Sequence, residues 1–228
     1  MQLSLPFTRS QQLGFDEFVE APGTDAVRFL ADPGEAHALV VGAPGTGKTH
    51  LLTAACQQAY QQEQQAAYIP LADTDTLTPA ILQGLASFDL VCVDDLDRVA
   101  GQPEWETALF NCYNECDAGA ARLVVAGTGA AQEIGFQLPD LVSRLRAALV
   151  LRTSPLDDEE AVVALRRRAA FASFELPDAV ARFLLRRIPR DMPTLVRALD
   201  ALAEHTFAEQ RKVTVPSARA WLEQQQID

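Results

Sequence analysis

The stretch Gly42-Ala43-Pro44-Gly45-Thr46-Gly47-Lys48-Thr49 decides the fold of this chain. It matches the pattern G-x-x-x-x-G-K-[ST] in full, in which glycines let the backbone aim its N–H groups at phosphate oxygens. An apolar strand over residues 38–41 precedes it, and a helix over residues 48–62 is predicted to follow. Because that helix directs the positive end of its dipole at the same place, the sequence predicts a phosphate-binding loop.

Two side chains of this loop have predicted chemical roles. Lys48 is expected to reach the β and γ phosphates of a nucleotide, and the Thr49 hydroxyl is expected to ligate Mg²⁺. The predicted nucleotide-binding residues of this region are Gly42, Pro44, Gly45, Thr46, Gly47, Lys48, Thr49 and His50.

Apolar runs and helical segments alternate on both sides of the loop. A helix that begins at Glu104 would place an apolar stripe along one face. We expect an α/β domain with a five-stranded parallel sheet flanked by helices. The predicted strands are 38–41, 66–71, 89–94, 122–127 and 147–151, the predicted helices are 48–62, 79–85 and 104–116, and the stripe is Trp105, Ala108, Leu109, Cys112, Tyr113 and Cys116.

A second, all-helical region is predicted to begin at Pro155. Four short helices are expected, which run from Asp157 or Asp158 to about Ala172, from Pro177 to Arg187, from Pro193 to Glu204, and from Thr214 or Pro216 through Trp221. The predicted organisation is therefore an N-terminal tail (1–14), a nucleotide-binding α/β domain (15–154) and a small helical domain (155–228).

Two carboxylates end the third predicted strand. Side chains at the carboxyl ends of parallel strands face the ligand crevice, so Asp94 is predicted to hold Mg²⁺ and Asp95 to polarise an attacking water. The alternative is that one of them only caps the turn into Asp97. A further strand lies between these carboxylates and the phosphate loop in the sequence, which is typical of NTPases with an inserted strand.

Two more polar residues are candidates with open alternatives. Thr128 follows the fourth strand and either helps to hold the attacking water or is an ordinary turn residue between Gly127 and Gly129. Arg144 lies near the start of the fifth strand and either completes a neighbour's active site or is a surface arginine.

Composition excludes some classes of function. The net charge is −12, with 31 acidic and 19 basic residues, which argues against strong direct binding of DNA, since phosphate contacts need clustered cations. No apolar run is long enough to predict a membrane span. Cys112 and Cys116 share a helix face, but no histidine lies near them, so we expect buried thiols and a reduced, cytoplasmic protein.

The N-terminal segment Gln2-Leu3-Ser4-Leu5-Pro6-Phe7 alternates apolar residues and then presents a proline and an aromatic ring. It is too short to fold alone. Two interpretations stay open from its residues, an extended peptide that docks into another protein and a frayed terminus.

Together these motifs resemble the AAA+ family, and within it the DnaA-like replication proteins and their Hda group of regulators. The resemblance covers nearly the whole chain and implies an AAA+ P-loop NTPase core with a small C-terminal all-α lid domain. It rests on the segment 2–7, on Val93-Asp94-Asp95, Leu138-Pro139-Asp140-Leu141 and Ser143-Arg144-Leu145, and on Phe174-Glu175-Leu176-Pro177, Arg182-Phe183-Leu184 and 210–216.

The resemblance implies roles that the residues alone leave open. Arg144 becomes an arginine finger that acts in trans on ATP held by DnaA, and Thr128 takes the sensor position. Phe15-Asp16-Glu17-Phe18-Val19 would form one wall of the base pocket. The N-terminal segment becomes a peptide that binds the beta subunit of the DNA polymerase III sliding clamp, through Gln2, Leu3, Leu5, Pro6 and Phe7.

The implied protein holds ADP or ATP with Mg²⁺, docks on the clamp and stimulates ATP hydrolysis by DnaA, which prevents re-initiation. It would be cytoplasmic, associated with the nucleoid through the clamp, with at least transient self-association as a homodimer or higher oligomer. The chain also stops where DnaA is expected to continue into a DNA-binding domain.

One departure bears on the chain's own hydrolysis. The family's nucleotide-sensing arginine in the helical domain corresponds to Pro193 here, and Arg190, one turn earlier, is the candidate substitute. Pro193 weakens the case for intrinsic turnover, whereas the complete phosphate loop favours it. A self-sufficient ATPase of the helicase-loader type is therefore the alternative, although only about fourteen residues precede the core. A DNA-binding initiator fragment is the weakest hypothesis.

Overall fold

The computed structural model describes residues 14–32, 34, 36–74, 76–208 and 212–225. These residues divide into two compact units. The first contains Pro22–Ser154 together with the described residues up to Asp16, and the second contains Glu17–Ala21 and the chain from Pro155 onward. No helix among the described residues is long and apolar enough to cross a membrane.

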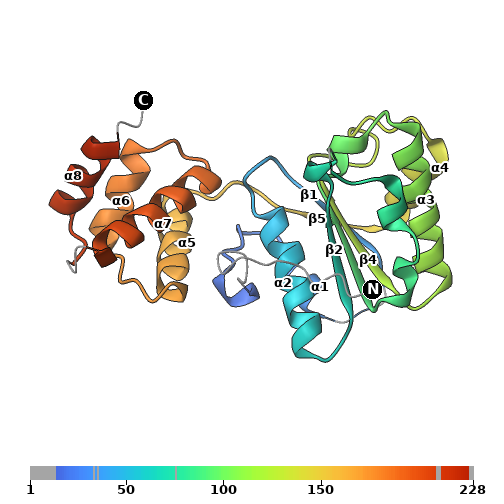
Figure 1. The fold of residues 1–228 in the computed structure, drawn as a ribbon, viewed down its shortest axis with the longest axis horizontal. Helices are drawn as coiled ribbons and strands as arrows, with labels where there is room; N and C mark the ends of the chain where they lie inside the picture. Colours follow the sequence, from blue (N-terminus) through green and yellow to red (C-terminus); the bar gives the residue numbers. More distant parts are fainter. Residues whose placement is uncertain (1–13, 33, 35, 75, 209–211, 226–228) are drawn as a thin grey trace. The chain divides into compact units, whose positions relative to one another are not determined.

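A five-stranded parallel sheet forms the centre of the first unit, as predicted (Figure 1). Its order is β2-β3-β4-β1-β5, so β4 separates β1 from β3 in the sheet, although β2 is the strand that lies between them in the sequence. β2 pairs only on its β3 side within the described sheet. The strands are β1 (Ala38–Val41), β2 (Ala66–Pro70), β3 (Leu90–Asp94), β4 (Arg122–Gly127) and β5 (Leu149–Arg152).

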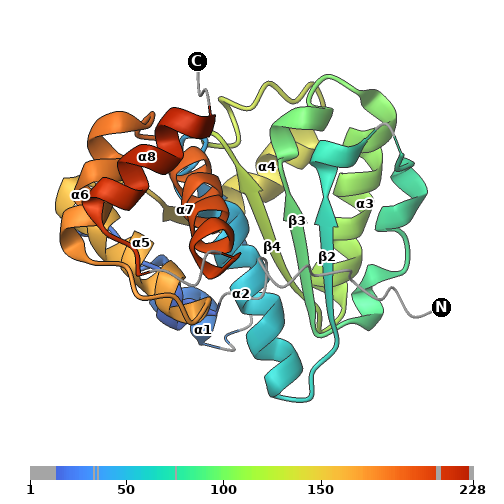
Figure 2. The same cartoon turned by 60° about the vertical axis from the view of Figure 1, so that its left-hand side comes forward.

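Helices cover both faces of this sheet. On one face lie α1 (Ala26–Ala31) and α2 (Lys48–Gln61), and on the other lie α3 (Pro103–Ala118) and α4 (Pro139–Ala147) (Figures 1 and 2). Alternate strand residues face opposite ways, so Leu39, Val93 and Val125 join the core beneath α3 and α4. The predicted stripe on α3 faces this core, with Trp105, Leu109, Cys112, Tyr113 and Cys116 buried and Ala108 packed at its margin.

Several short elements differ from those predicted. The segment 79–85 does not form one helix. A 3₁₀ turn, Pro79–Leu82, ends before Gly84, because the φ of 72° at Gly84 is incompatible with a continuing helix. A second 3₁₀ turn, Leu85–Ser87, follows. The predicted fifth strand starts at Leu149 rather than 147, because α4 runs to Ala147. Further 3₁₀ turns are η2 (Phe15–Glu17), η3 (Leu71–Asp73) and η6 (Leu96–Val99).

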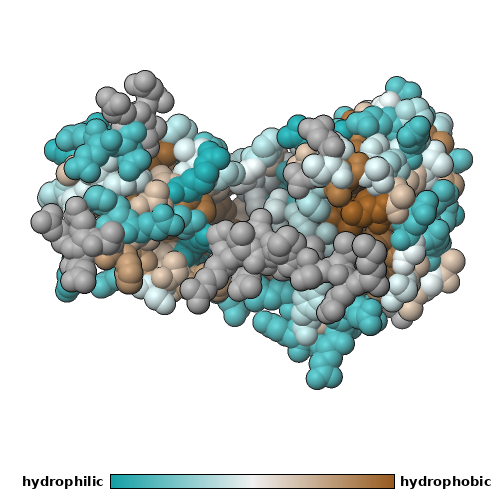
Figure 3. All heavy atoms as spheres, in the orientation of Figure 1, coloured by the Kyte–Doolittle hydropathy of each residue, from teal (hydrophilic) through white to brown (hydrophobic). Residues whose placement is uncertain are grey.

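The second unit is a four-helix lid with its own core, as predicted. Asp157 caps the first helix through a capping box with Glu160, and Asp191 accepts a hydrogen bond from Thr194 N–H (2.8 Å) at the start of the third. Trp221 lies in the shared core. Hydrophilic residues cover much of the lid surface in view in Figure 3. The helices are α5 (Asp158–Phe171), α6 (Asp178–Arg187), α7 (Met192–Ala208) and α8 (Val215–Gln225).

Candidate nucleotide-binding site and the opposite edge of the sheet

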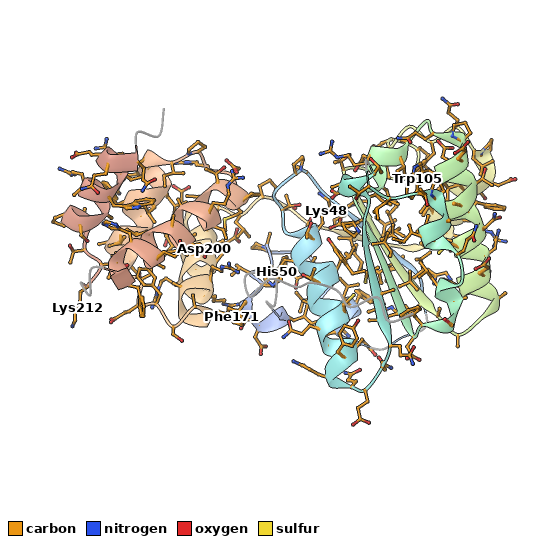
Figure 4. All side chains as sticks on the ribbon, in the orientation of Figure 1. Lys48, His50, Trp105, Phe171, Asp200 and Lys212 are labelled. Atoms are coloured by element: carbon orange, nitrogen blue, oxygen red, sulfur yellow. The ribbon has the colours of Figure 1, made fainter. Side chains whose placement is uncertain are left out.

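The predicted phosphate loop joins β1 to α2. Gly45 (φ 80°) and Gly47 (φ 91°) both have the positive φ that favours glycine, and Gly47 is the N-cap residue of α2. Lys48 is only 8% exposed, and its ammonium donates to the carbonyls of Gly42 (2.8 Å) and Ala43 (3.1 Å). The lysine head is therefore held inside the loop, at the start of α2 (Figure 4).

Close packing at Gly42 gives the loop its shape. A Cβ atom at this position would meet Thr153 Oγ1 at 2.1 Å, Thr153 O at 2.7 Å and Thr46 Oγ1 at 2.8 Å. The Thr46 and Thr153 hydroxyls are hydrogen-bonded to each other (2.6 Å), and Thr46 also donates to Ala43 O (2.8 Å). Thr153 follows β5, so two strands and the loop are joined at one point.

The residue types of this loop fit a nucleotide phosphate. Among the described residues, the hydrogen bonds of the Lys48 ammonium go to neutral carbonyls, and phosphate oxygens are stronger acceptors for an ammonium. Thr49 is exposed in the first turn of α2, a helix of 14 residues whose N-terminal N–H groups favour an anion. Lys48 and the loop would hold the phosphates, and Thr49 with Asp94 would hold Mg²⁺, which supplies charge neutralisation.

Asp94 ends β3 and is completely buried. Its carboxylate accepts hydrogen bonds from the Tyr68 hydroxyl (3.0 Å) and from Asp95 N–H (2.9 Å). Burial, and then the negative charge of Asp94, raise the pKa of Tyr68, so the phenol stays a proton donor. These two donors fix the orientation of the carboxylate at the end of the strand.

Asp95 follows in an unusual backbone conformation, with φ 59° and ψ 45°. A non-glycine residue is rarely found there, and such strain clusters at functional sites. Burial raises the pKa of Asp95, repulsion by Asp94 raises it further, and the charge of Lys48 opposes both. A raised pKa is the direction that a general base for water needs.

Thr128 lies at the same edge of the sheet, just after β4. Its hydroxyl and its backbone N–H both donate to the Asp97 carboxylate, the latter at 3.0 Å and 3.1 Å. Asp97 therefore ties the loop after β4 to the turn after β3. The sensor role of Thr128 stays a prediction. Asp97 is the residue that holds the Thr128 side chain in place.

Other predicted site residues have different surroundings. His50 Nε2 lies 2.9 Å from Gly14 O, within the first unit. Arg190 belongs to the lid, where its Nη1 pairs with Asp158 Oδ1 at 3.1 Å. The segment proposed as a base-pocket wall is divided between the two units after Asp16. Gln2, Leu3, Leu5, Pro6 and Phe7 lie outside the described residues.

Arg144 lies at the other edge of the sheet. It is in the last turn of α4, five residues before β5, and the first residue of β5, Leu149, pairs with Ala38, the first residue of β1. The phosphate loop follows the last residue of β1, so the loop begins roughly 13 Å from Ala38 along the strand, at 3.3 Å per residue. The Arg144 side chain is 45% exposed and pairs with Asp117 Oδ2 at 3.5 Å.

A buried carboxylate holds the start of the helix that carries Arg144. Glu106 is 1% exposed, and it accepts hydrogen bonds from the backbone N–H groups of Gly101 (2.7 Å), Gln137 (2.9 Å) and Leu138 (2.7 Å). Leu138 is the N-cap residue of α4. Glu106 therefore fixes the entry of α4 against α3.

Sequence reasoning missed several of these residues. Tyr68, Thr153 and Glu106 each act on a residue that is far away along the chain, so no local pattern marked them. Only Glu106 could have been suspected from the sequence, because it lies beside Trp105 on the apolar face of the predicted helix. A buried carboxylate in such a place needs hydrogen-bond partners. Among the described residues, no three His, Cys, Asp or Glu side chains gather as a metal site.

Comparisons with known proteins bear on the family and the fold of the chain. A family model described as "Hda, lid domain" matches residues 158–222, and one described as "Type III restriction enzyme, res subunit" matches residues 8–126. Domain III of the replication initiation protein DnaA from Thermotoga maritima is similar at 23% identity, with a TM-score of 0.78, over 96% of this chain and 98% of that one.

Two further solved structures have the same fold. AMPPCP-bound DnaA from Aquifex aeolicus is 19% identical with a TM-score of 0.68, over 83% of this chain and 64% of that one. The RuvB Holliday junction branch migration motor of Thermotoga maritima is 16% identical with a TM-score of 0.70, over 97% of this chain and 74% of that one.

Proposed function

Because the chain belongs to the DnaA/Hda family of AAA+ proteins, we propose that it regulates replication initiation by stimulating ATP hydrolysis in DnaA. Its residues 8–126 also belong to the family of the restriction-subunit model. That segment contains the phosphate loop and β3 and ends in β4. The match therefore supports nucleotide binding by this part of the chain.

The chain's own nucleotide is ADP or ATP with Mg²⁺, held at the loop edge of the sheet. The residue types at Lys48, Thr49 and Asp94 support this, and the similar DnaA of Aquifex aeolicus was solved with AMPPCP. The bound nucleotide favours the active form of the protein.

The position of Arg144 is the observation that carries the proposal. A guanidinium stabilises the charge that develops when a γ-phosphate is transferred, and an arginine supplied in trans raises such rates by about 10³–10⁵. Arg144 is separated from its own loop by the length of β1, and nearly half of its side chain is exposed. It is therefore suited to the nucleotide of a second protein, which is DnaA in this proposal.

Docking on the sliding clamp brings this protein to DNA that carries the clamp. The segment Gln2–Phe7 supplies the contact, with Gln2, Leu5 and Phe7 as the anchors. Its alternating apolar residues suit an extended peptide in a pocket.

The experiment that tests this function measures the rate of ATP hydrolysis by DnaA in the presence of clamp loaded on DNA, with and without this protein. Hydrolysis is expected to rise only when protein and clamp are both present. Removal of residues 1–7 is expected to abolish clamp binding and stimulation together. An unchanged rate of hydrolysis with the full-length protein would refute the function, and stimulation that survives the deletion would refute the docking role.

A self-sufficient ATPase is the second candidate, favoured by Asp95. The carboxyl has a raised pKa next to Lys48 and Asp94, which suits activation of water in the chain's own site. This candidate requires steady ATP turnover by the isolated protein, lost in Asp95→Asn and unaffected by DnaA. Absence of that turnover would leave the regulatory function as the sole candidate.

A further inference from the structure

We propose that Asp117 and His37 form a relay that positions Arg144 for its partner's nucleotide. The proposal rests on the proposed function, in which Arg144 acts in trans. Asp117 is then a positioning residue, since it acts through the guanidinium, and His37 orients Asp117 from the buried side.

The guanidinium of Arg144 is held from two directions by α3. Its Nη1 lies 3.5 Å from Asp117 Oδ2, and its Cζ lies 5.9 Å from the centre of the Tyr113 ring. Tyr113 and Asp117 are four residues apart on α3, so both face α4. Asp117 contacts Arg144 through one terminal nitrogen, and a guanidinium held in this way retains N–H groups to donate to a phosphate.

The buried side of the relay is His37, which lies just before β1 and whose side chain is 10% exposed. Leu123 N–H donates to His37 Nδ1 (3.1 Å), so this nitrogen must be unprotonated. The proton of the neutral ring is therefore on Nε2, which lies 3.7 Å from Asp117 Oδ1. The ring also packs edge-on against Tyr113, with centroids 4.9 Å apart.

Charged groups and one aromatic ring, from several elements, lie around His37. Asp117 and Tyr113 face it from α3, Arg122 acts from β4, and Arg144 lies beyond Asp117 on α4. Burial lowers the pKa of His37, Asp117 opposes this, and Arg122 lowers it further. His37 is therefore a neutral N–H donor near neutral pH, which preserves the acceptor that Leu123 needs.

The relay is built to release the arginine. Asp117 and Arg144 are each about half exposed, and exposed ion pairs of this kind are weak. A cavity of about 840 Å³ adjoins the pair, lined by Tyr113, Leu149 and Val150 among others. Arg144 thus has a preferred rest position and the space to leave it.

The kinetic test uses Asp117→Asn, which keeps the shape of the side chain and removes its charge. With clamp on DNA, the maximal rate of DnaA ATP hydrolysis is expected to fall about two- to five-fold, the size that an exposed pair sustains. The concentration of this protein that gives half of the maximal rate should not change. Asp117→Glu should restore part of the rate, and Asp178→Asn, which breaks a slightly more exposed pair with Arg166 on the lid, should have no effect.

A second test is independent of DnaA. In the full-length protein, ¹H–¹⁵N spectra of the histidine rings should show His37 as the Nε2–H form, and Asp117→Asn should lower its pKa, since Asp117 raises it. Asp178→Asn should leave that pKa unchanged. A proton on Nδ1, or a pKa that is indifferent to Asp117, would overturn the relay.

The two proposals fail in different ways. If Arg144→Ala keeps full stimulation, the trans role of Arg144 is wrong, whatever Asp117 does. If Arg144→Ala abolishes stimulation while Asp117→Asn keeps the wild-type rate or exceeds it, only the relay is wrong.

Discussion

The two edges of the sheet differ in how complete they are. At the carboxyl edge, the ammonium of Lys48, the carboxylates of Asp94 and Asp95 and the hydroxyl of Thr49 all come from this chain. At the amino edge, Arg144 is half exposed, and the contacts found among the described residues are the weak pair with Asp117 and the Tyr113 ring. The first edge supplies cationic, anionic and hydroxyl groups for a nucleotide, whereas the second, in the proposed function, offers Arg144 to a nucleotide outside the chain.

Under the proposed function, one parallel sheet serves two nucleotides, one at each edge. At the carboxyl edge, polar side chains at the strand ends are held by buried hydrogen bonds, such as that from Tyr68 to Asp94. Glu106 fixes the start of α4 near the carboxyl edge, and α4 then runs to the amino edge, where its last turn is accessible. Variants that damage one edge should therefore spare the other.

The largest effect is expected from Gly42→Ala. The added Cβ would collide with Thr153 and Thr46, so the loop cannot keep its path. ADP affinity is expected to fall more than about 100-fold, with a loss of about 1–3 kcal/mol in the free energy of unfolding. Isothermal titration and thermal unfolding measure the two. Gly34→Ala, where a Cβ meets open space, is the control, and equal behaviour of both variants would contradict the packed loop.

Lys48→Ala should weaken ADP binding by about 10- to 100-fold, because charged hydrogen bonds are worth about 1.5–3 kcal/mol. The control is Lys212→Ala, which removes the other lysine of the chain from the lid (Figure 4). Titration with ADP compares the two. If the variants bind ADP equally well, the loop lysine does not contact the phosphates and the carboxyl edge is not the site.

Glu106→Gln should lower stability and the stimulation of DnaA without changing ADP affinity. The amide replaces one acceptor oxygen with a donor that faces backbone N–H groups, so the free energy of unfolding should fall by about 1–3 kcal/mol. Stimulation of DnaA should fall as well, since α4 loses its anchor, while ADP affinity per folded molecule stays unchanged. Glu104→Gln, at an exposed position of the same helix, should show neither effect. Loss of ADP binding in Glu106→Gln would show that the anchor of α4 also supports the phosphate loop.

The smallest effect concerns Asp95 and pH. Its pKa in the folded protein is raised, mainly by burial, so the folded state binds the proton more tightly than the unfolded state does. Stability due to this group is therefore lost as pH rises from its unfolded pKa, about 3.9, through its folded pKa. Asp95→Asn should unfold at a higher temperature than the wild type at pH 7, and this gain should shrink towards pH 4. Destabilisation by Asp95→Asn at pH 7 would contradict the pKa direction.

The sequence predicted the carboxyl edge far better than the amino edge, for a physical reason. The phosphate loop is contiguous, and Asp94 follows an unbroken apolar strand, so local patterns mark both. The pair of Arg144 with Asp117 and the hydrogen bond from Leu123 to His37 join residues that are distant in the chain. The helices α1 and α4 were not predicted, since α1 has six residues and α4 has nine, which is little length for a periodic pattern.

The division of labour between the edges is the central claim, and Arg144→Ala tests it most directly. Arg146→Ala is the matched control, since Arg146 is exposed in the same turn of α4 and two residues along a helix points elsewhere. The measurement is hydrolysis of ATP by DnaA with clamp on DNA, alongside ADP titration of each variant. We predict that Arg144→Ala binds ADP normally and leaves DnaA at its own rate, while Arg146→Ala stimulates as the wild type does. Full stimulation by Arg144→Ala would contradict the claim.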